Sequence, residues 1–212
     1  MHDEDFPEKV RISFGSAIIL GLMKSIVDAE PTTIYMLTYS PNRCSANCAF
    51  CPQARESKGR SDMLSRVIWP VFKTEDVLPR VEGAYKSGRI RRVCIQALNH
   101  PSVQNDILGL AKAIRSRSDV PISVSCQPLD KGKMLKLAQI GVERVSIALD
   151  ASTREIFEKV KGAGVGGPYT WEGHLKALEE AVQIFGRNFV TTHLIAGLGE
   201  REEEIIQMVQ RC

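Results

Sequence analysis

Short apolar runs alternate with longer helical patterns through most of this chain of 212 residues. Glycine or proline separates several of these segments, as at Pro31, Gly88 and Gly141. Strands that alternate with helices of this length form βα units around a parallel sheet, so we expect an α/β fold. Strands are expected at about 33–39, 90–98, 120–126, 144–149 and 189–196. Helices are expected at about 74–87, 103–117, 130–140, 152–161 and 170–186, with a last one beginning near Glu200.

The composition is that of an ordinary globular protein, with 43% hydrophobic and 25% charged residues. The formal net charge is +3, so we expect neither nucleic acid nor a membrane as a partner. The apolar run at 14–29 is interrupted by Lys24 and Asp28 and is short for a membrane span. We expect it to form an amphipathic helix in an N-terminal helical extension, residues 1–32, ahead of a core domain at 33–212.

Three of the six cysteines, Cys44, Cys48 and Cys51, follow the first expected strand with the spacing C-x3-C-x2-C. A short loop that closes on three thiolates can wrap one face of a cubane iron–sulfur cluster, which normally takes four cysteine ligands. The iron left without a protein ligand could then bind substrate. Cysteines in a chain that shows no secretory signal also indicate a reducing compartment, so we expect the cytoplasm.

Other interpretations of these cysteines remain open from the spacing alone. Cys48 and Cys51 have a spacing that is common in zinc sites, although beyond this loop the next cysteine and histidine toward the C-terminus are as distant as Cys94 and His100. The cysteines could also be redox or disulfide cysteines. The non-enzymatic alternative is therefore an iron–sulfur or zinc-binding module.

With Phe50 directly before the third cysteine, the stretch resembles the signature of the radical S-adenosylmethionine (SAM) superfamily. The resemblance implies a [4Fe–4S] cluster on Cys44, Cys48 and Cys51, with SAM bound at the open iron. One electron from the cluster would cleave SAM to a 5′-deoxyadenosyl radical. The resemblance also implies a partial (β/α)6 barrel of the TIM-like type. About five βα units are visible in the sequence, so we expect the chain to stop before the sixth strand.

The carboxyl ends of the strands carry the site in such barrels. Period two places Ser146, Ala148 and Asp150 on one face of the strand at 144–149, where small side chains leave room for a ligand. From the residues alone, Asp150 either caps the next helix or bonds a ribose diol. In biotin synthase, which this region resembles, the equivalent strand ends in a ribose-binding Asp. The Asn of that family motif is replaced by Ala148.

The segment from His193 to Glu200 resembles the superfamily motif G-x-I-x-G-x-x-E, in which backbone and the Ile side chain pack on adenine. His193 replaces the leading glycine. The family's arginine for the SAM carboxylate has no clear counterpart, and Lys159 or Lys161 could serve instead. The cofactor-binding residues implied by the resemblance are Phe50, Asn99, Asp150, His193, Ile195 and Gly197.

Cys94 and Cys126 fall in strands that resemble those of biotin synthase that carry ligands of an auxiliary [2Fe–2S] cluster, the sulfur donor. The resemblance therefore implies an auxiliary iron–sulfur cluster on these two residues. Thr191 stands where a third ligand is expected. Buried cysteines in strands are also common, so a purely structural role stays open.

As a whole the chain resembles the biotin-synthase-like radical SAM proteins, and residues 39–54 and 157–200 resemble the group that includes two-component archaeal-type lipoyl synthases. The implied reaction is sulfur insertion into a protein-bound octanoyl chain by one component of a lipoyl synthase. The implied partners are SAM, an octanoylated protein or other small substrate, an electron donor such as ferredoxin or flavodoxin, and a second synthase component. The alternatives are a biotin-synthase-type reaction, which Ala148 and Thr191 disfavour, and a radical methylase or cofactor-biosynthesis enzyme.

Overall fold

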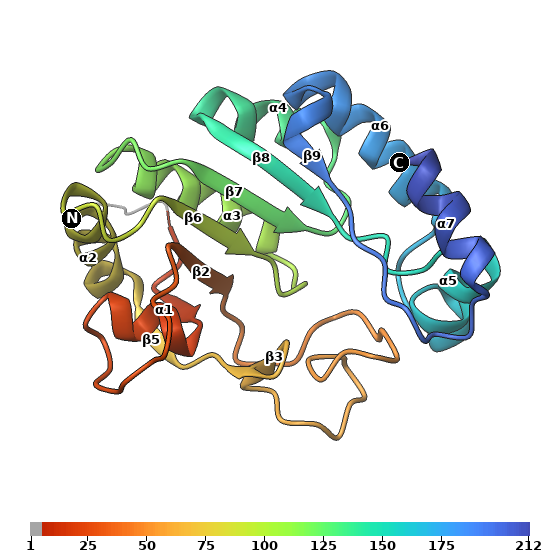
Figure 1. Ribbon diagram of the computed structural model, residues 1–212, viewed down its shortest axis with the longest axis horizontal. Coiled ribbons are helices and arrows are strands. Elements are labelled where there is room, and N and C mark those ends of the chain that lie inside the picture. The colour runs from red at the N-terminus through yellow and green to blue at the C-terminus, as the bar shows by residue number, and fades with distance from the viewer. Residues whose placement is uncertain (1–5) are drawn as a thin grey trace.

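The computed structural model describes residues 6–212 and has an α/β fold whose helices lie outside an arc of strands (Figure 1). Within these residues the main sheet has seven strands in the order β5-β1-β2-β6-β7-β8-β9. Their bounds are β1 Lys9–Ile12, β2 Thr33–Thr38, β5 Val71–Lys73, β6 Arg92–Gln96, β7 Ile122–Cys126, β8 Val142–Ile147 and β9 Val190–Thr191. The helices are α1 Phe14–Ile19, α2 Thr74–Lys86, α3 Val103–Arg115, α4 Lys131–Ile140, α5 Arg154–Val160, α6 Trp171–Phe185 and α7 Glu202–Arg211.

Strands β2, β6, β7, β8 and β9 are mutually parallel, whereas β1 and β5 are antiparallel to their neighbours. This is the expected partial barrel of the TIM-like type. Because parallel strands end at one edge of the sheet, the segments that follow β2, β6, β7 and β8 meet there. In Figure 1 the arrowheads of these strands point toward the segment around β3 (Met63–Leu64) and toward α5.

The alternation of side chains along the strands separates a core face from an inner face. Val93 and Ile95 of β6 are fully buried against the helices, while Cys94 and Gln96 on the opposite face are only partly buried. Each fully buried Val or Ile stabilises the fold by roughly 1.5–3 kcal/mol relative to an exposed side chain. The helix-side core therefore holds the sheet, and the inner face is left for polar groups.

Side-chain caps explain where several helices begin. Asp130 accepts a hydrogen bond from the Lys133 amide at 3.0 Å at the start of α4, and Thr170 does the same for α6. Thr153 caps α5 by accepting from the Ile156 amide at 3.3 Å. Thr153, not Asp150, is therefore the capping residue of α5, and the carboxylate of Asp150 is available for other contacts.

The N-terminal segment differs from the expectation of one long helix. Helix α1 ends at Ile19. Gly21 follows with a φ of 65°, a left-handed conformation that glycine adopts at little cost and that ends the helix. Strand β1 precedes the helix and pairs with β2, burying Val10 and Ile12 in the core. The segment before residue 33 is thus part strand and joins the main sheet.

Two further segments differ from the sequence analysis. Residues 52–70, where no strand was expected, contain a hairpin of β3 and β4 (Val67–Ile68). The Gln53 side chain holds this segment by donating to the carbonyls of Ser61 and Met63 at 2.6 and 2.7 Å. The strand expected at 189–196 is limited to β9, with one further bridge between Asp150 and Leu194. No helix in the described part of the chain is both long and apolar enough to cross a membrane.

Candidate functional site

A cavity of about 280 Å³ lies where the parallel strands end. Of the residues selected from the sequence as cofactor-binding, Phe50, Asn99, Asp150 and His193 line it. Ile195 and Gly197 are not among its lining residues, although the Ile195 amide donates to the Asp150 carbonyl at 2.8 Å. The fold therefore brings four of these six residues to one cavity and places the other two on the neighbouring segment.

The cysteine loop, residues 44–51, forms another wall, and Cys44, Cys48 and Cys51 all line the cavity. Backbone hydrogen bonds tie the loop to the end of one strand and to the end of one helix. The Ser45 amide donates to the Asn99 carbonyl after β6 at 2.8 Å, and the Ala49 amide donates to Val160 at the end of α5 at 2.8 Å. These bonds fix the loop against the barrel before any ligand binds.

The three thiols are free and interact electrostatically with one another. Burial raises the pKa of Cys48 to about 12, and the neighbouring Lys161 partly opposes this effect. Burial also raises the pKa of Cys51, to which Cys44 adds. If these thiols lose their protons, the neighbouring negative charges in a buried site need a compensating positive charge, which the iron ions of a cluster supply.

These residues fit an iron–sulfur cluster. Within residues 6–212, no three histidine, cysteine or acidic side chains converge closely enough to hold one metal ion. The three cysteines instead stand around a cavity that is large enough for a group of several atoms. A cubane takes its cysteines at separate corners, whereas a zinc ion draws its ligands to about 2.3 Å.

Asp150 also lines the cavity, and both of its carboxylate oxygens have partners. Its Oδ2 accepts from the Lys161 Nζ at 2.6 Å, and its Oδ1 lies 3.0 Å from the His193 Nε2. Burial raises the pKa of Asp150, but the hydrogen bond of His193 and the charge and hydrogen bond of Lys161 outweigh it. The pKa therefore lies below its ordinary value, and Asp150 is an anion that faces the cavity.

Lys161, one of the two lysines considered for the SAM carboxylate, is fully buried. Its Nζ also donates to the Ala148 carbonyl at 2.5 Å, and the ammonium lies over the rings of Phe157 and Tyr169. Lys161 thus pairs with a carboxylate of the protein itself. Its side chain projects inward from the end of α5, where the sequence gives no signal that separates a buried lysine from an exposed one.

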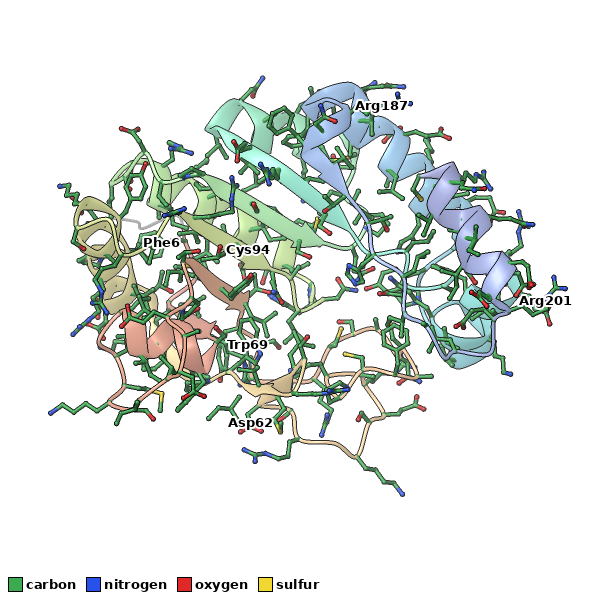
Figure 2. All side chains as sticks on the ribbon, viewed as in Figure 1. Phe6, Asp62, Trp69, Cys94, Arg187 and Arg201 are labelled. Carbon is green, nitrogen blue, oxygen red and sulfur yellow. The ribbon has the colours of Figure 1, made fainter. Side chains whose placement is uncertain are left out.

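Cys94 and Cys126, predicted to share an auxiliary cluster, are not brought together. Cys94 lies on the inner face of β6, aligned with Ser123, and Figure 2 labels its position on the sheet. Cys126 shares the helix-facing side of β7 with Ile122 and Val124 and is 5% exposed. Because strand side chains alternate between faces, the two thiols belong to opposite sides of the sheet. Cys126 touches the cavity only at the end of its strand, and Cys94 does not line it.

Several cavity residues were not found from the sequence. Tyr169 lines the cavity, and its hydrogen bond with Asn99 partly offsets the burial that raises its pKa. The hairpin contributes Leu64 and Ser65, and β7 is followed by Gln127. None of these residues belongs to a short spaced motif, and only Gln127 directly follows an expected strand.

Residues 38–212 match the family described as the Radical SAM superfamily, which is most of the chain. This chain belongs to the radical SAM superfamily. The cofactors of radical SAM proteins are a [4Fe–4S] cluster and SAM, which agrees with the donor set around the cavity.

The chain matches curated proteins over about half of their length. Biotin synthase from Magnetococcus marinus is 26% identical over 167 residues, which is 78% of this chain and 48% of that protein. A probable GTP 3′,8-cyclase from Thermococcus kodakarensis is 26% identical over 164 residues, which is 75% of this chain and 47% of that protein. The chain therefore spans about half the length of the curated relatives that it matches.

Two solved structures have a similar fold. Methylornithine synthase matches with a TM-score of 0.63 at 17% identity, over 84% of this chain and 49% of that chain. The FeFe-hydrogenase maturase HydG from Carboxydothermus hydrogenoformans matches with a TM-score of 0.62 at 20% identity, over 84% and 40%. At these identities the likeness establishes the fold and does not distinguish between reactions.

Proposed function

We propose that Cys44, Cys48 and Cys51 hold a [4Fe–4S] cluster in the cavity and that SAM binds beside it, with Asp150 accepting hydrogen bonds from the ribose. The observation that carries this proposal is that three free thiols and an ionised carboxylate line one cavity at the carboxyl ends of the strands. When bound, the two cofactors would supply a 5′-deoxyadenosyl radical that removes hydrogen from an unactivated carbon.

The chain's own part in this reaction is to orient the cofactors and exclude water. Phe50 packs against the cluster of buried apolar residues that contains Phe157 and covers one side of the cavity. Tyr169 and Asn99 are hydrogen-bonded to each other on the cavity wall. We propose that these groups, with the backbone at Ile195 and Gly197, enclose the adenosyl group and protect the radical.

For the reaction, we propose sulfur insertion into a protein-bound octanoyl chain, with this chain acting as one lipoyl synthase component. The similarity to biotin synthase supports a sulfur-inserting enzyme. Cys94 and Cys126 face opposite sides of the sheet, so this chain offers no paired cysteines for a sulfur-donating cluster within residues 6–212. The sulfur would then come from the second synthase component.

The remaining partners follow from the chemistry. Each sulfur inserted replaces one hydrogen, which leaves as part of 5′-deoxyadenosine, and each cleaved SAM takes one electron. We therefore propose a small electron carrier such as ferredoxin or flavodoxin as the donor. Reduced clusters and free thiols persist in reducing compartments, and for this reason we propose a cytoplasmic location.

The test is anaerobic and uses reconstituted, reduced protein of the longest natural chain. SAM, an octanoyl-lysine peptide and the second component are added, and 5′-deoxyadenosine and the peptide mass are followed together. Deoxyadenosine with a sulfur-bearing peptide is the expected result. Deoxyadenosine without a change in the peptide would contradict lipoyl synthesis and direct the search to dethiobiotin and other substrates.

Cysteine variants separate the cluster from the rest of the proposal. Cys44→Ala, Cys48→Ala and Cys51→Ala should each abolish the cubane signal, and an intact signal in any of them would overturn the ligand assignment. Cys94→Ser and Cys126→Ser serve as matched controls and should keep the full iron content, because the two residues face opposite sides of the sheet. A loss of iron in both of these controls would instead support the assignment of an auxiliary cluster to Cys94 and Cys126.

A further inference from the structure

The two partners of Asp150 differ sharply in how firmly they are held. The Lys161 side chain is 0% exposed, whereas the His193 side chain is 54% exposed. Both approach the same carboxylate, one at each oxygen, at 2.6 and 3.0 Å. One partner is therefore built into the wall of the cavity, and the other can leave without disturbing the core.

Lys161 is held on several sides. Its ammonium donates to the Ala148 carbonyl at 2.5 Å and lies 5.5 Å from the centre of the Tyr169 ring. The backbone behind it is closely packed, because a Cβ added to Gly167 would stand 2.1 Å from the Lys161 carbonyl oxygen. A buried ammonium with these contacts cannot turn to a new partner without leaving Asp150 as an unpaired buried charge.

Apart from the contact of its imidazole with Asp150, His193 is held through its backbone. Its carbonyl accepts from the Asp150 amide at 2.9 Å, which holds the main chain beside the end of β8. The imidazole projects to the cavity wall and is more than half exposed, so it can rotate into solvent while this backbone bond stays intact. The oxygen that it occupies, Oδ1, is the one that does not bond Lys161.

We propose that Lys161 is a positioning residue that fixes the Asp150 carboxylate, and that His193 is a displaceable occupant of the oxygen that ribose hydroxyls take when SAM binds. The inference rests on the proposed function, in which Asp150 receives the ribose. Asp150 itself has a φ of 68°, so its backbone is held in a conformation that side-chain-bearing residues seldom adopt. A carboxylate fixed at one oxygen and exchangeable at the other receives a diol without reorganising the wall.

The two residues should therefore respond in opposite directions when SAM binding is measured. The measurement is anaerobic calorimetric titration of SAM into protein with an oxidised [4Fe–4S] cluster, which binds SAM without cleaving it. Lys161→Met should weaken binding by about tenfold or more, because the carboxylate loses its fixed partner. His193→Ala should tighten binding by up to about tenfold, because a competitor is removed, and unchanged binding would show that His193 does not compete with the ligand. His193→Gln, which keeps a donor, should bind like the unsubstituted protein.

Controls separate positioning from general structure. Lys176→Met removes an exposed lysine of α6 that pairs with Glu180 and should not alter SAM binding. Iron content and Tm are measured for every variant, and the change that SAM causes in the EPR spectrum of the reduced cluster provides a second signal. If Lys161→Met does not load the cluster, Lys161→Gln, which keeps donors but no charge, is used and should show the same weakening.

The outcomes distinguish this inference from the function on which it rests. Asp150→Asn should weaken SAM binding; if it does not, the ribose role fails and the inference falls with it. If Asp150→Asn weakens binding while Lys161→Met and Lys161→Gln bind normally, only the positioning role is overturned. If His193→Ala weakens binding severalfold, His193 contacts the ligand directly and is not a displaced occupant.

Discussion

His174 is a titratable residue in contact with Tyr169 and Gln127, two residues that line the cavity. It is fully buried, with Nδ1 3.1 Å from the Thr170 carbonyl and Nε2 3.2 Å from the Gln127 side chain. Its ring meets those of Phe157 and Tyr169 edge-on. Burial, with a smaller contribution from the charge of Lys161, lowers the pKa of His174 to about 4. The imidazole is therefore neutral in the folded protein.

This shift predicts that acid destabilises the protein through His174. In the unfolded chain the residue has its ordinary pKa of 6.5, so between pH 6.5 and about 4 the unfolded chain binds a proton that the folded chain does not. Stability is fully present above pH 6.5 and falls as the pH drops. His174→Gln should reduce the loss of unfolding free energy between pH 7 and pH 5 by roughly 2 kcal/mol, measured by urea titration. Equal losses in both proteins would contradict the assignment.

The glycine-rich loop, residues 162–168, supports the cysteine loop. The Asn47 side chain donates to the Val165 carbonyl at 2.8 Å, which links the two loops directly. The close approach to α5 requires glycine, since a Cβ at Gly164 would stand 2.6 Å from the Glu158 carbonyl oxygen and one at Gly167 would meet Lys161. The composition of this loop is thus explained by packing.

Gly167→Ala should therefore destabilise the protein and weaken cluster loading. Its methyl group would meet backbone atoms that cannot move aside, at a cost of about 1–3 kcal/mol. Gly83→Ala is the matched control, because Gly83 lies in α2 with no atom within 4 Å of its added Cβ. The control should gain up to about 1 kcal/mol from helix propensity. Thermal unfolding and iron content test both variants, and a neutral Gly167→Ala would refute the packing argument.

The whole molecule keeps its main hydrophobic core apart from the cysteine loop. The buried residues of that core come from the sheet and the helices that cover it, and none lies in 44–51. The loop instead adjoins a small separate cluster of Leu37, Trp69 and Leu98, against which Cys44 and Leu64 pack. Figure 2 labels Trp69 between the sheet and the hairpin. The barrel does not depend on the loop for its burial of apolar surface.

Removal of iron should accordingly leave the barrel folded. Chelation of the reconstituted protein should not change the far-UV circular dichroism, because helices and strands are held by the separate core. Reloading the cluster should raise Tm by at least a few degrees, because a ligand that binds only the folded state stabilises it. Hydrogen exchange should show slower exchange mainly at 44–54 on loading. Loss of helical signal on chelation would show that the cluster is required for the fold.

Most of the elements were predicted from local pattern, and the misses have local causes. Helices α2, α3, α4 and α6 lie within a few residues of their expected ranges, because amphipathic periodicity and end signals are local properties. The run at 14–29 is apolar enough for a helix, but the left-handed turn at Gly21 ends α1 early. The short strand β1 could not be anticipated, because its pairing with β2 and β5 is a contact between segments distant in the sequence.

The family, the parallel α/β fold, the three-cysteine loop and the position of Asp150 at a strand end could all be predicted, because each depends on residues that are close along the chain. Tertiary structure, by contrast, places Cys94 and Cys126 on opposite sides of the sheet, since their faces depend on where each strand begins. It also decided that Lys161 is buried against Asp150, which lies 11 residues earlier and on another element. A lysine at a helix end is charged and flexible, and whether it meets water or a carboxylate depends on how the helix packs.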